Sequence, residues 1–181
     1  MSTGLLWSVA LALLLFWAVG AYNRLVRLRS QALQAFGALA LQLQRRNLLA
    51  QGFGLPDAAE GGPPVAEAVA ALAGLHAAAQ QCAASLAAAK ARPLDRPSMA
   101  ALGAAQAVLL EAWQRLLAGL PERRGARTPD RQRAEWEQAA LQLAAASDEF
   151  NQAVLRYNGA VAQFPASVLA AVFGLRRAGT L

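Results

Sequence analysis

Hydrophobic residues follow two different patterns along this chain. Residues 5–21 form a run without any charged residue. Beyond this run, apolar residues recur in alternating steps of three and four, which is the spacing of helices that pack against one another. The longest example comprises Trp136, Ala140, Leu143, Ser147, Phe150, Val154, Tyr157, Val161 and Phe164. The patterns predict one apolar helix followed by several amphipathic helices.

Glycine and proline residues divide the amphipathic part into four helical segments. The segments cover about 22–51, 65–92, 98–120 and 130–164. Ser98 and Asp130 are the predicted N-caps of the third and fourth segments. The apolar stripe of the first segment consists of Val26, Leu33, Phe36, Ala40 and Leu43. Four such stripes bury one another most economically in an antiparallel, up-down four-helix bundle.

The uncharged run is long enough to cross a membrane, because with its flanks it reaches about 20 residues and a hydrocarbon core is ~30 Å thick. A cleaved signal peptide is the alternative, since small residues surround Gly20, but residues 1–4 lack the positive charge that such a peptide needs. Arg24, Arg27 and Arg29 follow the run, so the positive-inside rule places the amino terminus outside and the rest in the cytoplasm. The expected domains are an anchor at 1–21, a helical bundle at 22–164 and a tail at 165–181.

Composition agrees with an all-α fold and narrows the choice of partners. The chain has 46 alanines and no isoleucine, so strong helix formers dominate. Its net charge of +6 suits an anionic surface. Lipid is favoured over nucleic acid, because no run interleaves basic and aromatic residues as a base-stacking surface would.

The residues of the chain do not form a pattern typical of an enzyme. His76 has no second histidine with which to build a zinc site, and Cys82 has no partner for an internal disulfide. Phosphate-loop, dinucleotide-binding and metalloprotease motifs are missing. We therefore expect a non-enzyme without cofactor or metal, in which His76 is an ordinary helix residue and Cys82 a small buried apolar residue.

Both ends of the chain contain a tyrosine followed by an asparagine, and these tyrosines are the only two. The motifs are Tyr22-Asn23-Arg24-Leu25-Val26-Arg27-Leu28-Arg29, then Gln42-Leu43-Gln44-Arg45-Arg46, and near the end Phe150-Asn151, Tyr157-Asn158, Phe164-Pro165 and Phe173-Gly174. In these motifs the chain resembles the LemA family of bacterial membrane proteins, as a divergent member. The signature positions are Tyr22, Asn23, Leu25, Val26, Arg29, Gln42, Arg45, Arg46, Phe150, Asn151, Tyr157, Asn158, Phe164 and Pro165.

The resemblance covers both ends of the chain and is loose between about residues 50 and 140. It implies a helical bundle tethered by a single span to the bacterial inner (cytoplasmic) membrane, in agreement with the hydrophobic pattern. It implies no particular molecular activity. Ala140 and Ser147 stand roughly where the family often has Glu and Arg, so a function that needs those charges is in doubt for this chain.

Three asparagines near the predicted membrane-proximal end are candidates for polar contacts. Asn23, Asn151 and Asn158 are poor mid-helix residues, so each is expected to bond across helices or to backbone. Such contacts either set the register of the bundle or form a polar docking surface near the lipid.

The tail after Pro165 is predicted to form a short, basic amphipathic helix. It either lies on an anionic lipid surface or folds back to cap the bundle. The residues of the lipid contact would be Val168, Leu169, Val172, Phe173, Arg176 and Arg177.

These expectations combine into a single-span protein that acts as a scaffold or adaptor at the cytoplasmic face. Its expected partners are the lipid bilayer and a protein of unknown identity, with a homo-oligomer as a further candidate assembly. The alternative is an oligomeric membrane-shaping or stalk protein in which bundles pack laterally, and an enzyme is a remote alternative. Apolar residues exposed on the outer faces of the bundle would discriminate between the first two.

Overall fold

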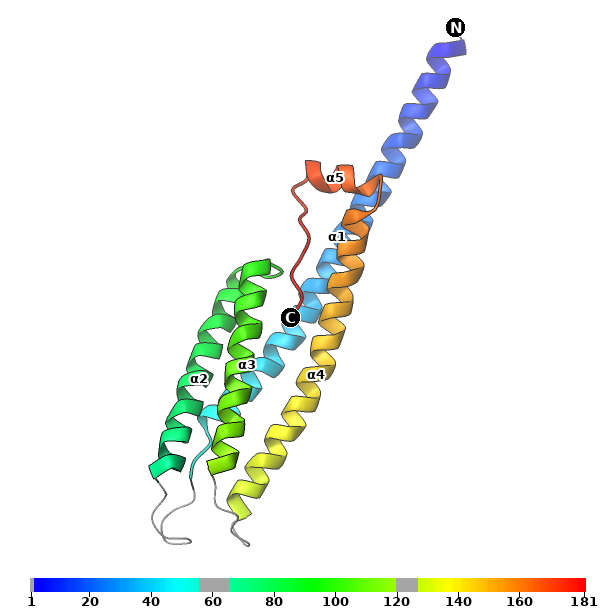
Figure 1. Cartoon of the computed structure of the whole chain (residues 1–181). Helices are drawn as coiled ribbons and strands as arrows, with labels where there is room; N and C mark the ends of the chain where they lie inside the picture. Colours follow the sequence, from blue (N-terminus) through cyan, green and yellow to red (C-terminus); the bar gives the residue numbers. More distant parts are fainter. Residues whose placement is uncertain (1, 56–65, 120–126) are drawn as a thin grey trace.

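The computed structural model describes residues 2–55, 66–119 and 127–181, and of residues 2, 3 and 127–130 only the helical backbone. Every regular element in these ranges is an α-helix, which confirms the predicted all-α fold (Figure 1). The helices are α1 (Ser2–Gln51), α2 (Ala66–Ala91), α3 (Arg96–Gly119), α4 (Arg127–Ala162) and α5 (Ala166–Val172).

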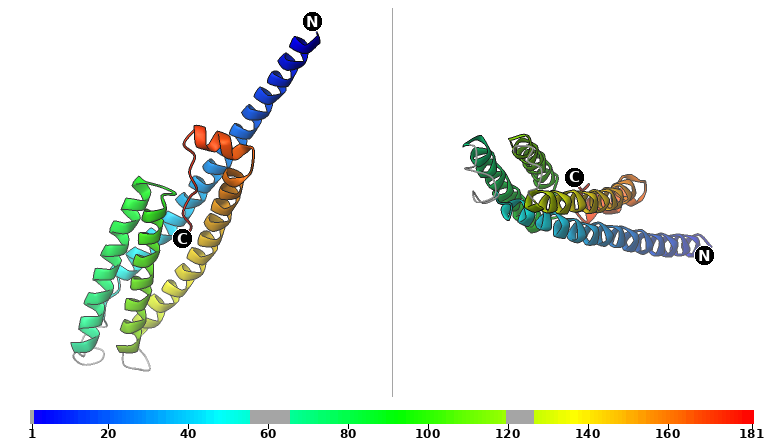
Figure 2. Two further views of the ribbon diagram at one scale, coloured as in Figure 1. Left: turned by 45° about the horizontal axis from the view of Figure 1, so that its top comes forward. Right: turned by 90° about the horizontal axis from the view of Figure 1, so that it is seen from below.

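Helix α1 is the longest element of the fold. It has 50 residues without a proline, which corresponds to a length of about 75 Å. Its amino-terminal part is long and apolar enough to cross a membrane, and none of that apolar window is buried in the protein. The figures show this part projecting alone beyond the other helices (Figures 1 and 2). The prediction of one apolar amino-terminal helix is thereby confirmed.

The second half of α1 is the centre of the folded body. Helix α1 packs against α2, α4 and α5, and α2 packs against α3. In both figures α1 lies beside α4 and α2 lies beside α3 (Figures 1 and 2). Between α3 and α4, the indole rings of Trp113 and Trp136 stack with centroids 4.3 Å apart. The closed antiparallel four-helix bundle remains a prediction.

The apolar stripe of α1 differs by one position from the predicted stripe just after the uncharged run. Leu25 is buried, whereas Val26 has 42% of its surface exposed. The buried positions continue in heptad steps through Ala32, Phe36, Leu39 and Leu43. The prediction of Val26 as a core residue was wrong because the steps of three and four start at Leu25.

Most predicted stripe positions of α4 are buried, Ala140 and Ser147 are half-buried, and the last position differs. Phe150, Val154 and Tyr157 are fully or almost fully buried, but Phe164 is 80% exposed. Helix α4 ends at Ala162, so Phe164 lies in the turn before Pro165 and leaves the packed face.

The start of α3 also differs from its prediction. Asp95, not Ser98, is the N-cap: the backbone amide and the hydroxyl of Ser98 both donate to Oδ2 of Asp95, at 3.1 and 2.8 Å. Helix α4 starts at Arg127, before the predicted cap Asp130. Two predicted stripe residues, Val65 and Leu120, and the side chain of Asp130 lie outside the described residues.

We expect Phe150→Ala to lower the free energy of unfolding by about 3–5 kcal/mol, because it removes a large buried aromatic side chain. Phe150 has none of its surface exposed, and its ring centroid lies 5.8 Å from that of Phe36 on α1. Leu155→Ala on the same helix is the control, since Leu155 is 61% exposed and should change stability little. Thermal unfolding measures both. Equal melting temperatures for the two variants would show that the α1–α4 contact is not the core.

Candidate functional site

The chain turns back at the carboxyl end of α4. Helix α5 lies against α1 and α4, and Gly174 ends it in the left-handed conformation with a φ of 65°. The amide of Leu175 then donates to the carbonyl of Ala170 at 2.8 Å, as in a helix-terminating glycine turn. Residues 175–181, which we call the return segment, run back along α4 toward the start of α3 (Figure 1).

Two asparagines of α4 hold the backbone of the return segment. The amide nitrogen of Asn158 donates to the carbonyl of Ala178 at 3.0 Å, and its side-chain oxygen accepts the Ala178 amide at 2.8 Å. Asn151 makes the same pair of bonds with Leu181, at 3.1 and 2.9 Å. Each asparagine therefore binds both backbone groups of one residue, as a neighbouring β-strand would.

The spacing of these residues explains why both pairs form at once. Asn151 and Asn158 are two helical turns apart and lie on one face of α4, about 10 Å from each other. Ala178 and Leu181 are three residues apart in an extended chain, which also gives about 10 Å. The helix and the return segment thus present their polar groups at the same interval.

The three asparagines were expected to bond across helices or to backbone, and the structure shows such bonds for two of them. Asn151 and Asn158 bond to backbone, one of the predicted alternatives, but what they fix is the position of the return segment and not the register between helices. Asn23 is exposed on α1, and no hydrogen bond of its side chain is found among the described residues. A polar bond of Asn23 stays a prediction.

Further bonds fasten the return segment on both sides. The buried hydroxyl of Tyr157 donates to the carbonyl of Arg176 at 3.0 Å, and burial raises the pKa of Tyr157. The amide of Gly179 donates to the carbonyl of Leu94 at 3.0 Å. A Cβ at position 179 would lie 2.9 Å from the Cα of Arg96, so only glycine fits this approach. The return segment therefore connects α4 to the turn before α3.

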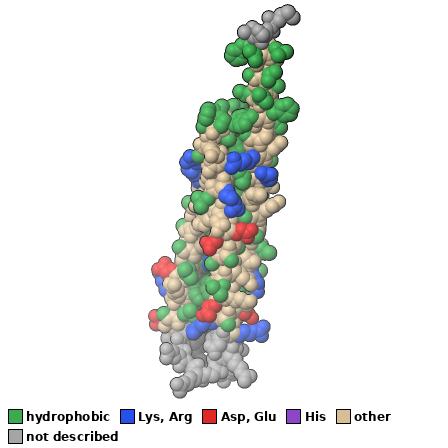
Figure 3. All heavy atoms as spheres, turned by 90° about the vertical axis from the view of Figure 1, so that its right-hand side faces the viewer, with side chains coloured by type: hydrophobic (Ala, Val, Ile, Leu, Met, Phe, Trp, Pro, Cys, Tyr) green, Lys and Arg blue, Asp and Glu red, His purple; other side chains and the backbone are tan. Residues whose placement is uncertain are grey.

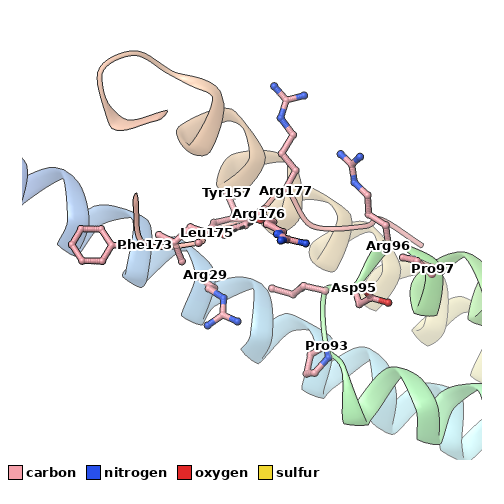
Figure 4. Close-up of a pocket in the computed structure, with 12 residues that line it drawn as sticks. Arg29, Pro93, Asp95, Arg96, Pro97, Tyr157, Phe173, Leu175, Arg176 and Arg177 are labelled. Carbon is pink, nitrogen blue, oxygen red and sulfur yellow. Dashed lines mark hydrogen bonds between the residues drawn. The ribbon is translucent and has the colours of Figure 1, made fainter. Parts of the chain in front are cut away.

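The return segment, α1 and the turn before α3 line an open pocket of about 590 Å³, which we call the juxtamembrane pocket because it lies next to the end of the uncharged run that is predicted to cross a membrane (Figure 4). Its basic lining residues are Arg29, Arg96, Arg176 and Arg177. In Figure 4 Arg176 extends between the return segment and Asp95, whereas the side chains of Arg177 and Arg96 extend to one side of it and that of Arg29 to the other. Among the described residues none of these four arginines is in an ion pair.

Asp95 is the acidic residue of the pocket lining, and it already has a structural task. Its carboxylate accepts the two bonds from Ser98 that cap α3, and these bonds lower the pKa of Asp95. The carboxylate is thus held at the start of α3 and stays ionised, so it offsets one of the positive charges around it. Sequence analysis missed Asp95 and Gly179; the Asp-x-x-Ser spacing before a helix was the available signal for the first.

An apolar surface lies beside the pocket, at the end of the uncharged run of α1. Phe173 lines the pocket, and its ring centroid lies 4.7 Å from that of Tyr22. Val168, Val172 and Phe173 are each more than half exposed, whereas Ala170 of α5 is buried. Figure 3 shows apolar side chains along the projecting part of α1 and around its base, with a group of Lys and Arg side chains directly below.

The two predicted roles of the tail fall on different residues. The return segment folds back onto α4, as in the capping alternative. The side chains of Val168, Val172, Phe173, Arg176 and Arg177 are exposed, and Leu169 is half-buried. Contact of this exposed group with lipid stays a prediction.

The signature residues in the middle of α1 form a separate polar layer. Arg45 is exposed and donates to Oε1 of Gln142 at 2.9 Å. Arg46 is buried, donates to Gln106 at 3.4 Å and lies 5.6 Å from the ring centroid of Trp136. Gln42 is half-buried beside it on the helix. Burial lowers the pKa of Arg46.

His76 and Cys82 have the environments expected of structural residues. Nε2 of His76 lies 3.1 Å from the carbonyl oxygen of Phe53, just after α1. Cys82 is fully buried, and this burial raises the pKa of its thiol. In the described parts of the chain, no three His, Cys, Asp or Glu residues are grouped so that they could hold a metal ion.

Comparison with known proteins gives no relative for this chain. No family model matches it, and neither the curated proteins nor the solved structures contain a match. The assignment of a function consequently rests on the residues and geometry described above.

We expect Asn158→Ala to release the return segment, because the amide and carbonyl of Ala178 lose both partners. The loss of two bonds at a partly buried site should cost about 1–3 kcal/mol of unfolding free energy. Hydrogen exchange followed by mass spectrometry should show faster exchange in residues 175–181. Asn23→Ala is the control, since Asn23 is exposed. Unchanged exchange in the Asn158 variant would mean that the asparagines do not hold this segment.

Proposed function

We propose that this protein is a single-span scaffold at the cytoplasmic face of a bacterial inner membrane. The observation that carries the proposal is the division of α1 into two halves. Its amino-terminal part exposes large apolar side chains such as Trp7 and Phe16, whereas its second half is the centre of a folded body. One continuous helix thus joins a membrane-compatible surface to a protein core without a hinge, and the body is held at a fixed place beside the bilayer.

The proposed orientation rests on charge. Arg24, Arg27 and Arg29 follow the uncharged run, and all three are exposed. Positive residues next to a span remain on the cytoplasmic side, so the amino terminus would lie outside and the body inside.

We further propose that the body is an antiparallel four-helix bundle and that the chain is a divergent LemA-type protein. The packing of α1 on α4, of α2 on α3 and of α1 on α2 supports the bundle. The signature residues support the family proposal, because many of them act together: Asn151, Tyr157 and Asn158 hold the return segment, and Tyr22 packs on Phe173 after α5.

A partner protein is proposed because the outer faces of the body expose leucines at helical spacing. Leu41 and Leu48 are two turns apart on α1 and are 65% and 61% exposed. Leu141 and Leu155 on α4 are 74% and 61% exposed. Such stripes suit the apolar face of another helix. They also support the second candidate function, an oligomeric stalk, in which that helix belongs to another copy of the chain.

The orientation predicts the behaviour of fusions after Leu181. A reporter that works only in the cytoplasm should be active, and one that works only outside the cytoplasmic membrane should be silent, because the positive charges retain the body inside. Reversing the charges with Arg24→Glu, Arg27→Glu and Arg29→Glu should weaken this preference. The opposite pattern of reporter activity in the unmodified chain would overturn the proposed orientation, and so would a mature chain that begins near Ala21.

Replacing Leu48 by a photo-crosslinking amino acid distinguishes a scaffold, which binds a different protein, from a stalk, which binds another copy of the chain. In membranes, we expect a discrete adduct with a different protein, because Leu48 lies on the exposed leucine stripe. The control position is Glu111, which is exposed and ion-paired with Arg115. An adduct with a second copy of the chain would favour the stalk. Equal labelling from both positions would contradict both functions at this surface, since the leucine stripe of α1 would then not be a preferred contact.

A further inference from the structure

We propose that the juxtamembrane pocket binds the phosphate group of an anionic phospholipid. The proposal deepens the proposed function and rests on it, because the membrane anchor is what brings the pocket to the bilayer. A phospholipid and a small soluble phosphate ester both carry a phosphate that such a pocket could bind. The position of the pocket favours the phosphate of a lipid headgroup.

The charge of the lining is the first argument. Arg29 comes from α1, Arg96 from the start of α3, and Arg176 and Arg177 from the return segment. Four arginines and one aspartate give a local formal charge of +3. A negatively charged ligand in the pocket would be attracted by this net positive charge. Guanidinium groups can bind two oxygens of a phosphate at once.

The place of the pocket along α1 is the second argument. Tyr22 directly follows the uncharged run, and its aromatic partner Phe173 lines the pocket. Tyrosine at this level is typical of the membrane–water interface. Arg29 lies seven residues further on, about 10 Å along the helix, close to where the headgroup layer ends. A lipid phosphate in the cytoplasmic leaflet would therefore be level with the pocket.

The size and the surroundings of the pocket suit a lipid headgroup. A volume of about 590 Å³ is ample for a glycerophosphate headgroup. Phe173 lines the pocket, and the exposed side chains of Val168 and Val172 precede it on α5 and would contact the acyl chains. A basic surface for the phosphate and an apolar surface for the acyl chains could thus contact the same lipid molecule.

The pocket depends on Asn151 and Asn158, because they hold the return segment that forms one of its walls. Gly174, Leu175, Arg176 and Arg177 line one wall, and this wall is positioned by Asn158 and Tyr157 on α4. Loosening the segment removes two of the four arginines from the site. The asparagines are thus positioning residues for the anion, and none of their own side-chain atoms lines the pocket.

The test uses the full chain in a zwitterionic detergent, titrated with short-chain phosphatidylglycerol and monitored by its melting temperature. We expect a saturable rise with phosphatidylglycerol and none with short-chain phosphatidylcholine. Arg29→Gln with Arg176→Gln should weaken the apparent affinity at least tenfold. The matched control is Arg115→Gln with Arg131→Gln, which removes two charges from exposed ion pairs far along the body and should bind as the unmodified chain does.

Two further measurements test whether the ligand is a lipid and whether the return segment forms the wall of the pocket. Inorganic phosphate and glycerol phosphate, at equal concentration, should shift the melting temperature far less than the lipid; an equal shift would overturn the lipid source. Asn158→Ala should weaken lipid binding while the helical circular dichroism spectrum is retained. Equal affinity of the pocket and control double variants would overturn the pocket itself. Because the measurement is made in detergent, it is independent of orientation and of any partner protein, so its failure is distinguishable from failure of the scaffold.

Discussion

The fold depends on one constraint: α1 must remain a single helix while its surroundings change from an apolar exterior to a protein core. Alanine and leucine satisfy both environments, because they favour helix wherever they lie. The change is therefore made by the side chains and not by a break in the backbone. Trp7 and Phe16 are exposed, whereas Leu25, Phe36 and Leu43 are buried under the neighbouring helices. Everything that packs on α1 is thereby fixed relative to its projecting end.

The return segment shows how a helix can bind an extended chain without a β-sheet. Helical residues seven apart and extended residues three apart have nearly equal spacing. An asparagine has one donor and one acceptor side by side, so it satisfies both backbone groups of one residue. Asn151 and Asn158 combine the two properties. Replacement by glutamine would keep the same groups on a longer arm and lose the match in distance.

The sequence predicted the helices well because heptad spacing and proline positions act locally. It failed where a residue's environment is decided by distant chain. The Leu25 start of the α1 stripe depends on which face α4 and α5 cover, and nothing in residues 22–29 states this. The exposure of Phe164 follows from the turn after α4. The partner of Asn158 is twenty residues away in a segment that has no regular pattern.

The juxtamembrane pocket was foreseeable only in outline. The positions of Arg29 and Arg96 could be brought together from an up-and-down path of the helices. The wall of the pocket that the return segment forms could not be predicted. The course of this segment is set by Gly174 and by the close approach of Gly179 to Arg96. Glycines in a tail otherwise resemble ordinary linker residues.

Arg46 illustrates how the body resolves an unfavourable burial. A buried guanidinium without a carboxylate normally destabilises a core. Here the ring of Trp136 and the amide of Gln106 offset part of that cost, and both lie on elements other than α1. Any rotation or shift of α1 would move the Arg46 guanidinium away from these partners and leave its charge among apolar side chains. We therefore interpret Arg46 as a residue that sets the register, which trades stability for a single position of α1 against α3 and α4.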